Sequence, residues 1–387
     1  MTATLVCSRV FSPWSAEPTR LAAAFLEDST DGPVDVVRAD LDATLPRARP
    51  RPAIDAAIRH TVSVGFPDDP ATWADLGAYA ESAVRTARAW RDEGDGWVAG
   101  YSGPMGLADH LSLALLRGLG VVPAWTAHLS DLPTHDAAGA RRLDPVAEGA
   151  LLATCRRLLG GWNVPLPTAD LAADWVLALV AGGADRIVVA DPALADALLT
   201  LPAWRDLPAL ADRIEVWTRP PVPMPRRVGA DRIRITTHVD ALTLPILDPV
   251  LRAAALLPPG ERDRIRLVLY AVEPVPVATA LRRHALEDAV EVVVDDGSPC
   301  PGGDLALVVD PPIPDGMPCF PAPPADLADA EASGIPVILL APQDSPRTRH
   351  PAAHHLPTEH VSAARALLSR LAEAPRQGSP EPATARG

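Results

Sequence analysis

A histidine and an aspartate directly follow one of the apolar segments of this 387-residue sequence. The segment is Val121–Ala127, and His128 and Asp131 lie in the loop after it. We expect the segment to be a strand, and loops at strand ends contain functional residues more often than the rest of a surface. Both side chains can hydrogen-bond the hydroxyl groups of a ligand, so His128 and Asp131 are the best catalytic candidates in the first half. The alternative is two ordinary loop residues, with Asp131 and Thr134 capping the next segment.

Three residues at the end of a second predicted strand could line the same site. Tyr101, Ser102 and Gly103 lie where the apolar segment Gly96–Tyr101 gives way to a helical pattern. The alternative is a plain strand-to-helix turn. In the second half, His238 lies just after the predicted strand Arg232–Thr236, where a histidine is as often a packed, hydrogen-bonded group as a ligand contact.

Several other chemistries lack their sequence signatures. Four histidines lie close together in one segment: His350, His354, His355 and His360. Pro351 and Pro357 prevent a continuous helix from presenting them, and no cysteine is near. We therefore expect no metal site there. The sequence has no G-x-S-x-G elbow, no Walker loop and no G-x-G-x-x-G after its first strand. Acyl hydrolases, ATPases and dinucleotide oxidoreductases are therefore disfavoured, and we expect no cofactor.

Composition narrows the class of protein further. The formal net charge is -14, and all 35 basic residues are arginine, scattered along the chain. Such a chain is a poor ligand for nucleic acid. No apolar run reaches the roughly 18–20 residues of a membrane span, and the N-terminus lacks the pattern of a signal peptide. The 4 cysteines are far apart and never form C-x-x-C, which is typical of reduced thiols, so we expect a cytoplasmic protein.

Apolar strands alternate with helical patterns along the chain, which is the signature of parallel sheets covered on both faces. The pattern predicts these strands: Thr2–Cys7, Val34–Arg38, His60–Gly65, Gly96–Tyr101, Val121–Ala127, Ile187–Ala190, Arg232–Thr236, Arg266–Tyr270, Val290–Val294, Leu305–Val309 and Pro336–Leu340. The proline-rich stretch after Trp217 separates two sets of them. We expect a domain over residues 1–217, a linker over 218–230, a second domain over 231–373 and a disordered tail over 374–387.

Four blocks of the sequence resemble bacterial GT-B glycosyltransferases of the retaining, family 4 type. The blocks are Gly96–Pro133, Ala184–Leu198, Thr236–Leu242 and Pro324–Pro342, and their order and spacing match the family over most of the chain. The resemblance implies an α/β fold of two Rossmann-like, doubly wound domains facing a cleft, with the acceptor side in the first domain and the donor side in the second.

The resemblance also implies roles for individual residues. Asp329 would accept hydrogen bonds from the donor ribose, and Gly334 and His238 would lie on the donor side. His128 would hydrogen-bond a hydroxyl of the donor sugar and Asp131 the acceptor, with Tyr101, Ser102 and Gly103 on the acceptor side. Alternatively, Asp329 is a solvated acid in a first helical turn, and Gly334 serves only the turn that ends its helix.

The sequence departs from the family pattern at the donor site. The family's lysine falls on Asp326 and a glycine of its first donor-domain loop falls on Asp240, while the glycine-rich loop after the next strand is replaced by Ala271–Pro274. A lysine neutralises a donor diphosphate, and glycines let backbone amides approach it. An aspartate in place of the lysine adds like charge.

These observations predict a glycosyltransferase that transfers a sugar, without a metal, from a nucleotide-sugar donor to a small-molecule, glycan or lipid-linked acceptor. The missing lysine and glycines leave a second hypothesis open: a catalytically degenerate homologue that binds or scaffolds a partner transferase. A nucleotide-sugar epimerase is a third and weaker hypothesis, because that activity also occurs on this two-domain architecture.

Overall fold

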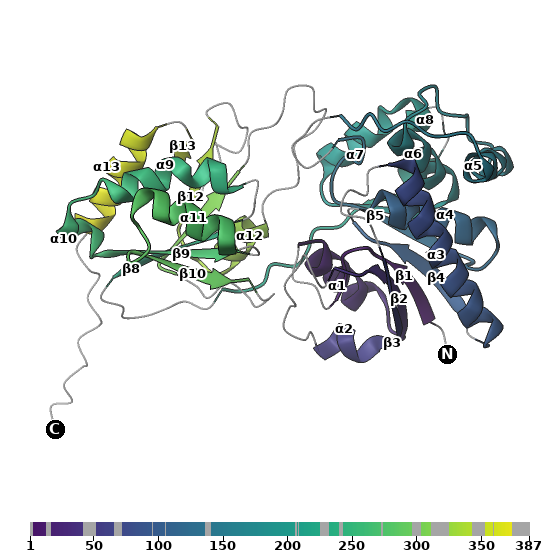
Figure 1. Cartoon of the computed structure of the whole chain (residues 1–387), viewed down its shortest axis with the longest axis horizontal. Coiled ribbons are helices and arrows are strands. Elements are labelled where there is room, and N and C mark those ends of the chain that lie inside the picture. The colour runs from purple at the N-terminus through teal and green to yellow at the C-terminus, as the bar shows by residue number, and fades with distance from the viewer. Residues whose placement is uncertain are drawn as a thin grey trace. The chain divides into compact units, whose positions relative to one another are not determined.

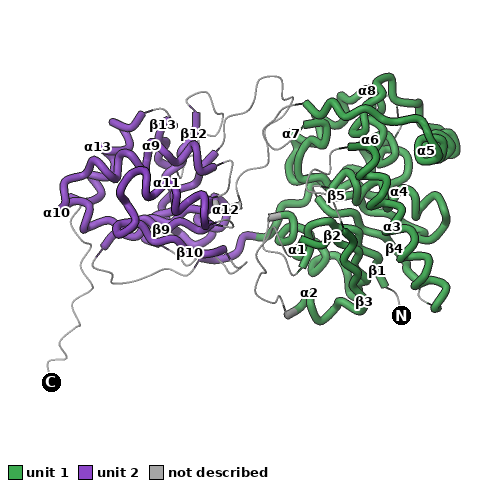
Figure 2. Tube along the Cα trace, viewed as in Figure 1, with its two compact units in different colours: residues 1–220, 313–322 green, residues 221–312, 323–387 purple. Residues whose placement is uncertain are grey.

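The computed structural model of the chain contains two compact units, coloured separately in Figure 2. Unit 1 comprises residues 1–220 and 313–322, and unit 2 comprises residues 221–312 and 323–387. The structure describes residues 3–12, 17–41, 52–65, 72–94, 96–104, 106–135, 141–205, 207, 209–224, 232–239, 243–271, 274–295, 303–310, 325–342, 353–358 and 360–373.

Unit 1 is built on a seven-stranded parallel sheet with the strand order β3-β2-β1-β4-β5-β6-β7. The strand order reverses between β1 and β4, which is the switch point where doubly wound sheets bind ligands. The strands are β1 Ala3–Cys7, β2 Val34–Ala39, β3 Ile58–Val64, β4 Trp97–Ser102, β5 Trp125–Leu129, β6 Arg186–Val189 and β7 Ile214–Val216.

Helices cover both faces of this sheet (Figure 1). All five residues of β1 are buried, because a strand in the middle of a covered parallel sheet has no solvent face. The larger core contains the inner sides of α3, α4 and α6, and the smaller core contains those of α1 and α2. The helices are α1 Glu17–Ser29, α2 Pro52–Ala57, α3 Trp73–Asp92, α4 Leu107–Gly118, α5 Ala150–Gly161, α6 Ala172–Gly183, α7 Pro192–Leu199 and α8 Pro202–Arg205, with a 3-10 turn at Ala211–Arg213.

Unit 2 repeats the plan with a six-stranded parallel sheet of order β10-β9-β8-β11-β12-β13. Its switch point lies between β8 and β11. The strands are β8 Ile233–Val239, β9 Ile265–Ala271, β10 Val290–Val294, β11 Leu305–Val309, β12 Val337–Ala341 and β13 Ala353–Pro357.

The two faces of the second sheet are covered differently. The cores show α9, α11 and α13 packed on one face, whereas the described cover of the other face is α12 with Ile335 and Met224. The helices are α9 Thr243–Ala255, α10 Pro259–Arg262, α11 Pro274–His284, α12 Ala325–Ala332 and α13 Val361–Glu373.

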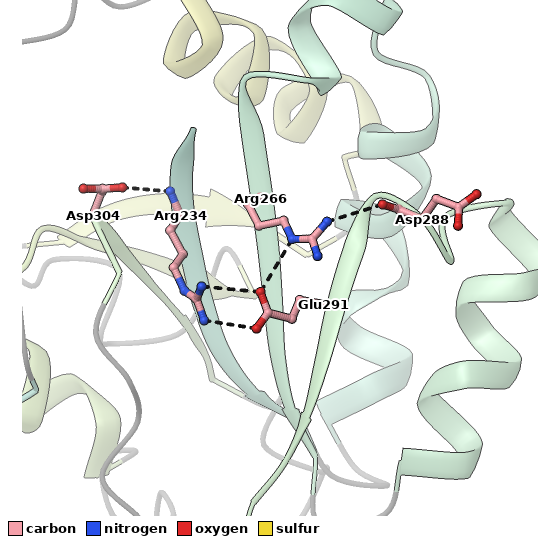
Figure 3. Close-up of polar contacts among 5 residues, drawn as sticks. All are labelled: Arg234, Arg266, Asp288, Glu291 and Asp304. Atoms are coloured by element: carbon pink, nitrogen blue, oxygen red, sulfur yellow. Dashed lines mark hydrogen bonds and ion pairs between the residues drawn. The ribbon is translucent and has the colours of Figure 1, made fainter. Parts of the chain in front are cut away.

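Charged side chains take part in covering that second face near the start of β8, β9 and β10. Figure 3 shows Arg234 and Arg266 directed toward Glu291. The two Arg234 Nη atoms lie 3.4 and 3.5 Å from the Glu291 carboxylate, and Arg266 Nε lies 3.6 Å from it. The Arg234 amide also donates to Asp304 Oδ2 at 2.8 Å. The network links three strands at the edge opposite their carboxyl ends.

The predicted fold class is confirmed: two Rossmann-like α/β domains with parallel sheets. The helical pattern of Pro249–Leu257 predicts a helix that starts at the proline, and this start is wrong, because α9 begins at Thr243. Proline is favoured at a helix start, but here Leu247, Val250 and Leu251 bury one continuous apolar side against the sheet. That burial outweighs the cost of a proline inside the helix.

A second helix also starts later than the sequence predicts. The pattern of Pro145–Leu159 predicts a helix, but α5 begins at Ala150. Pro145 instead pairs with Leu171 in an isolated bridge, and the Val146 amide donates to the Asp170 carbonyl. The short strands β7 and β13, at the ends of their sheets, were missed. The predicted tail from residue 374 lies outside the described residues. Among the residues that are described, no helix is long and apolar enough to cross a membrane.

Candidate functional site

Tyr101 and His128 meet at the carboxyl ends of β4 and β5, one strand from the switch point. The Tyr101 hydroxyl and His128 Nδ1 are 2.8 Å apart, a hydrogen bond between two buried side chains. The parallel register places Thr126 opposite Tyr101, so His128 lies beyond Tyr101 toward the end of the sheet. The structure thus brings together two of the residues that the sequence singles out, and both lie in strands. Tyr101 belongs to β4, and His128 belongs to β5 rather than to the predicted loop after it, because β5 runs from Trp125 to Leu129.

Aromatic rings enclose His128 on the smaller-core face of the sheet. Phe25 of α1 lies 5.4 Å from the imidazole, and Trp217, just after β7, lies edge-on at 5.8 Å. Phe25 also stacks on Tyr101 at 5.5 Å. His128 is 0% exposed as a result, and its Nε2 has no hydrogen-bond partner within the described part of the chain.

Burial lowers the pKa of His128 to about 3, because the apolar surroundings penalise the imidazolium. The ring is therefore neutral at physiological pH. If the Tyr101 hydroxyl donates to Nδ1, the proton of the neutral ring lies on Nε2, which makes that atom a hydrogen-bond donor. In this state His128 offers a hydrogen-bond donor at Nε2 but no positive charge, and that donor is buried.

Ser102 points to the opposite face of the sheet, as alternation along a strand requires. Its Oγ accepts a hydrogen bond from Trp125 Nε1 at 2.9 Å and lies 2.7 Å from His110 Nδ1. The pKa of His110 is lowered to about 3, by burial first and then by the nearby His128. Ser102 is thus fully engaged inside the protein, and its predicted place on an acceptor side stays a prediction.

Gly103 lies at the switch point and permits β1 and β4 to end in close contact. A Cβ atom at Gly103 would lie 2.3 Å from Ser8 Oγ and 2.8 Å from Ser8 Cβ. The Gly103 amide donates to the carbonyl of Cys7 at 2.9 Å. Any larger residue would push the two strand ends apart, which explains the glycine by packing.

Asp131 lies in the loop after β5, and that loop is fixed to the loop after β4. The Ser130 amide and hydroxyl both donate to the Pro104 carbonyl at 3.1 Å. Desolvation raises the pKa of Asp131 to about 6, against the opposing charge of Arg142. A carboxyl group with a pKa near 6 is suited to accept a proton at neutral pH.

Asp109 is a buried carboxyl group that the sequence reasoning missed. It lies in the first turn of α4, and its Oδ1 accepts a hydrogen bond from the Arg9 amide at 2.8 Å. Desolvation raises its pKa to about 7, although the hydrogen bonds from Arg9 and Tyr79 oppose this. The Asp109 charge in turn raises the pKa of Cys7, after burial as the larger cause.

Asp109 and His110 were missed because the burial of their helix on all sides comes from the fold. Both belong to the run Ala108–Leu116, of which every residue is buried, so α4 is enclosed on all sides. Polar residues in such a helix must point into the protein, whereas an amphipathic pattern would place them on a solvent face. Unexpected buried acids also end two strands of unit 2, namely Asp295 after β10 and Asp310 after β11.

The predicted donor residues are spread over unit 2. His238 lies near the end of β8 and packs against Tyr270 at 5.5 Å. Asp329 is in α12, 8% exposed, and its Oδ1 accepts the Val222 amide at 2.7 Å. Gly334 follows α12 with φ at +63°, and the hydrogen bonds around it form a Schellman motif. Gly334 is therefore explained by turn chemistry, and a donor contact there stays a prediction.

Most of the residues that depart from the family pattern lie beyond what the structure describes, although Ala271 ends β9 and Pro274 begins α11. Those beyond it are Asp240, Val272, Glu273 and the side chain of Asp326. In the described ranges, no three histidine, cysteine, aspartate or glutamate side chains gather in a way that could hold a metal ion.

No protein-family model matches the sequence, and no curated protein matches it. Solved structures match over nearly the whole chain. WaaG, a glycosyltransferase involved in lipopolysaccharide biosynthesis, has a TM-score of 0.51 at 12% identity, covering 96% of this chain and 90% of that one. OtsA has a TM-score of 0.50 at 14% identity, covering 96% and 91%. A UDP-N-acetylglucosamine 2-epimerase has a TM-score of 0.49 at 13% identity, covering 96% and 87%.

The two sheets, their strand orders and the matches to WaaG and OtsA define a protein of the GT-B fold. At 12% and 14% identity the likeness concerns the fold, so the assignment to retaining family 4 stays a prediction.

Proposed function

We propose that this protein is a glycosyltransferase that uses a nucleotide-sugar donor. The observation that supports this most is the group of shifted pKa values at the carboxyl ends of β4 and β5, in a chain of the GT-B fold. Asp131 and His128 both have pKa values moved toward the neutral form there. Such shifts cluster at functional sites, because catalytic groups need pKa values matched to their tasks.

The proposed chemistry rests on these two groups. Asp131, with a pKa of about 6, accepts hydrogen bonds from an acceptor hydroxyl or takes its proton. His128, neutral and held by Tyr101, donates from Nε2 to a hydroxyl oxygen of the donor sugar, which requires the rings of Phe25 and Trp217 to move off it. The protein then acts chiefly by positioning and by electrostatic stabilisation, and no step needs a metal. The acceptor is a small molecule, a glycan or a lipid-linked sugar.

Calorimetric titration with UDP, GDP and TDP nucleotides tests the donor part of the proposal. We expect one of them to bind with a dissociation constant well below about 1 mM. Binding weaker than that for all three would overturn the enzyme assignment. Incubation with a nucleotide-sugar alone provides a second readout, since formation of an epimer without any acceptor would identify an epimerase instead.

The catalytic part is tested by Asp131→Asn. Loss of a group that accepts a proton should lower kcat by about 10²–10⁴-fold. Asp170→Asn is a matched control, because it makes the same exchange at an exposed aspartate that lies before α6. Equal activity of the two variants would remove Asp131 from the mechanism.

A second candidate function has a specific observation in its favour. His128 is 0% exposed under Phe25 and Trp217, and one oxygen of Asp329 is occupied by the Val222 amide. The His128 Nε2 donor is therefore covered, and one acceptor oxygen of Asp329 is already used within the chain. A degenerate homologue that binds a partner transferase would fit this closure. It predicts no nucleotide binding and no transfer, so the titration above separates the two functions.

A further inference from the structure

The linker segment Trp217–Met224, which we call the strap, is fastened at both of its ends. Proline fills three of its positions, Pro220, Pro221 and Pro223, which stiffens the chain and removes three backbone donors. From Pro220 to Met224, Val222 and Met224 are thus the residues that retain an amide N–H. Both amides donate to side chains of α12 or of the turn directly after it.

Val222 and Met224 each donate their backbone amide to one particular side-chain oxygen. The Val222 amide donates to Asp329 Oδ1 at 2.7 Å, and the Met224 amide donates to Ser333 Oγ at 2.7 Å. The Ser333 hydroxyl itself donates to the Asp329 carbonyl at 2.6 Å, which turns its lone pairs toward the strap. The Met224 side chain is buried in the core beneath α12.

The spacing of donors and acceptors matches. Four residues of an α-helix rise about 6 Å, which is the spacing from Asp329 in α12 to Ser333 in the turn directly after it. Two residues of an extended, proline-rich chain rise about 6.2 Å, which separates the Val222 and Met224 amides. Because the two repeats agree, alternate residues of the strap meet successive turns of the helix.

The first end of the strap is fixed within unit 1. The Trp217 amide continues the sheet by donating to the Val189 carbonyl at 2.9 Å. Its indole Nε1 donates to Asp28 Oδ2 at 3.3 Å, and its ring meets Phe25 edge-on at 5.3 Å. Trp217 also contacts His128, so this end covers a predicted catalytic residue.

We propose that Asp329 and Ser333 form a docking site for the proline-rich strap, with Trp217 as its fastening in unit 1, so that bending between the fastenings is confined to residues 218–221. Asp329 then acts as a positioning residue for the linker rather than only as a ligand contact. This inference does not depend on the proposed function, since it requires no nucleotide.

Hydrogen exchange of the full chain, resolved to single amides by mass spectrometry with electron-transfer fragmentation, tests the proposal. In the wild type, the Val222 and Met224 amides should exchange at least about tenfold more slowly than those of Thr218 and Arg219, after correction for intrinsic rates. Equal protection at all four amides would overturn the proposal.

Variants separate docking from general destabilisation. Asp329→Ala should remove protection at Val222, whereas Asp329→Asn retains an acceptor oxygen and should restore it. Ser333→Ala should release Met224 first and leave β12 protected as in the wild type. If Asp329→Ala prevents folding, the wild-type pattern and Ser333→Ala still decide the matter. Unchanged protection of Met224 in Ser333→Ala would contradict the docking site.

Discussion

Buried carboxyl groups at the two ends of the sheet in unit 1 have pKa values shifted in opposite directions. Near the start of β2, Asp35 is 0% exposed and accepts hydrogen bonds from Arg59 Nε at 3.0 Å and from Trp97 Nε1 at 2.8 Å. Burial alone would raise its pKa, but these hydrogen bonds and the Arg59 charge lower it on balance. At the other end, Asp109 is also buried, and its pKa rises to about 7 because desolvation outweighs the hydrogen bond from the Arg9 amide and the Arg9 charge.

The difference shows that the ionised carboxylate of Asp35 stabilises the fold, whereas ionisation of Asp109 destabilises it. A buried carboxylate with its partners in place stabilises the native state once it is ionised. A buried carboxyl group with a raised pKa destabilises the native state when it ionises, and such groups are retained at functional sites more often than elsewhere. The polar groups at the carboxyl ends of β4 and β5 belong to the second kind.

The largest effect is expected from Asp35→Ala. Removal of the carboxylate leaves Arg59 and the buried Trp97 Nε1 without this acceptor, and breaking a buried pair costs about 3–5 kcal/mol. All 9 tryptophans precede Thr218, so tryptophan fluorescence during denaturant unfolding reports on unit 1 alone. A loss below about 1 kcal/mol would show that Asp35 does not distinguish this end of the sheet.

The wild-type contribution of Asp35 should also depend on pH. Its pKa is lowered in the folded state, so the stabilisation is present above the ordinary value of 3.8 and is lost as the pH falls through that value and below.

Asp109→Asn should have the opposite sign. The pKa of Asp109 rises from 3.8 to about 7 on folding, so its contribution to stability is complete below pH 4 and is lost as the pH rises from about 4 to 7. The amide keeps an oxygen for the Arg9 amide and cannot ionise. At pH 8 the variant should exceed the wild type in unfolding free energy by on the order of 2–4 kcal/mol, with no such gain at pH 4. Equal pH profiles of the two proteins would refute the assignment.

Trp217→Ala tests whether enclosure by the indole lowers the pKa of His128. In the wild type, burial lowers the pKa of His128 to about 3, so its imidazole should not titrate between pH 5 and 8. Removing the indole that covers it should move the pKa toward the ordinary 6.5. NMR of histidine-labelled protein, with His128→Gln for assignment, measures this. A titrating His128 in the wild type would be inconsistent with the enclosure.

The smallest effect is expected from Glu291→Gln in unit 2. Glu291 is 35% exposed, and its contacts with Arg234 and Arg266 are 3.4 to 3.6 Å long. A long, partly solvated ion pair contributes less than about 1 kcal/mol. Hydrogen exchange at β8 and β9 provides the readout. Loss of protection as large as that caused by Asp35→Ala in unit 1 would mean that the two networks are equivalent.

The fold could be predicted from the sequence because its cause is local. Apolar segments such as Val121–Ala127, whose last residues belong to β5, alternate with amphipathic helices, and that pattern specifies parallel sheets with little help from distant contacts. Pro249 shows the limit of local reasoning, since a proline marked a helix start that burial of its neighbours overrides. The positions of His128 and Asp131 near strand ends are a result of the same pattern.

The state of those site residues could not be predicted, because it arises between distant segments. The pKa of His128 depends on Phe25 and Trp217, which approach it from α1 and from the end of β7. Asp109 is buried because α4 is enclosed by α3 and α6, which a single helical pattern does not reveal. The partner of Asp329 is a backbone amide of the linker, and backbone amides have no sequence signature.

The alternation of prolines and amides in the strap has a consequence for changes in chain length. One residue inserted between Val222 and Met224 would shift the next amide past Ser333, so the docked part has a fixed register. Residues added between Trp217 and Val222 would leave every described hydrogen bond at the two ends in place. Positions 218–221 are therefore a defined insertion site, where a spacer or a reporter domain can be added without disturbing either core.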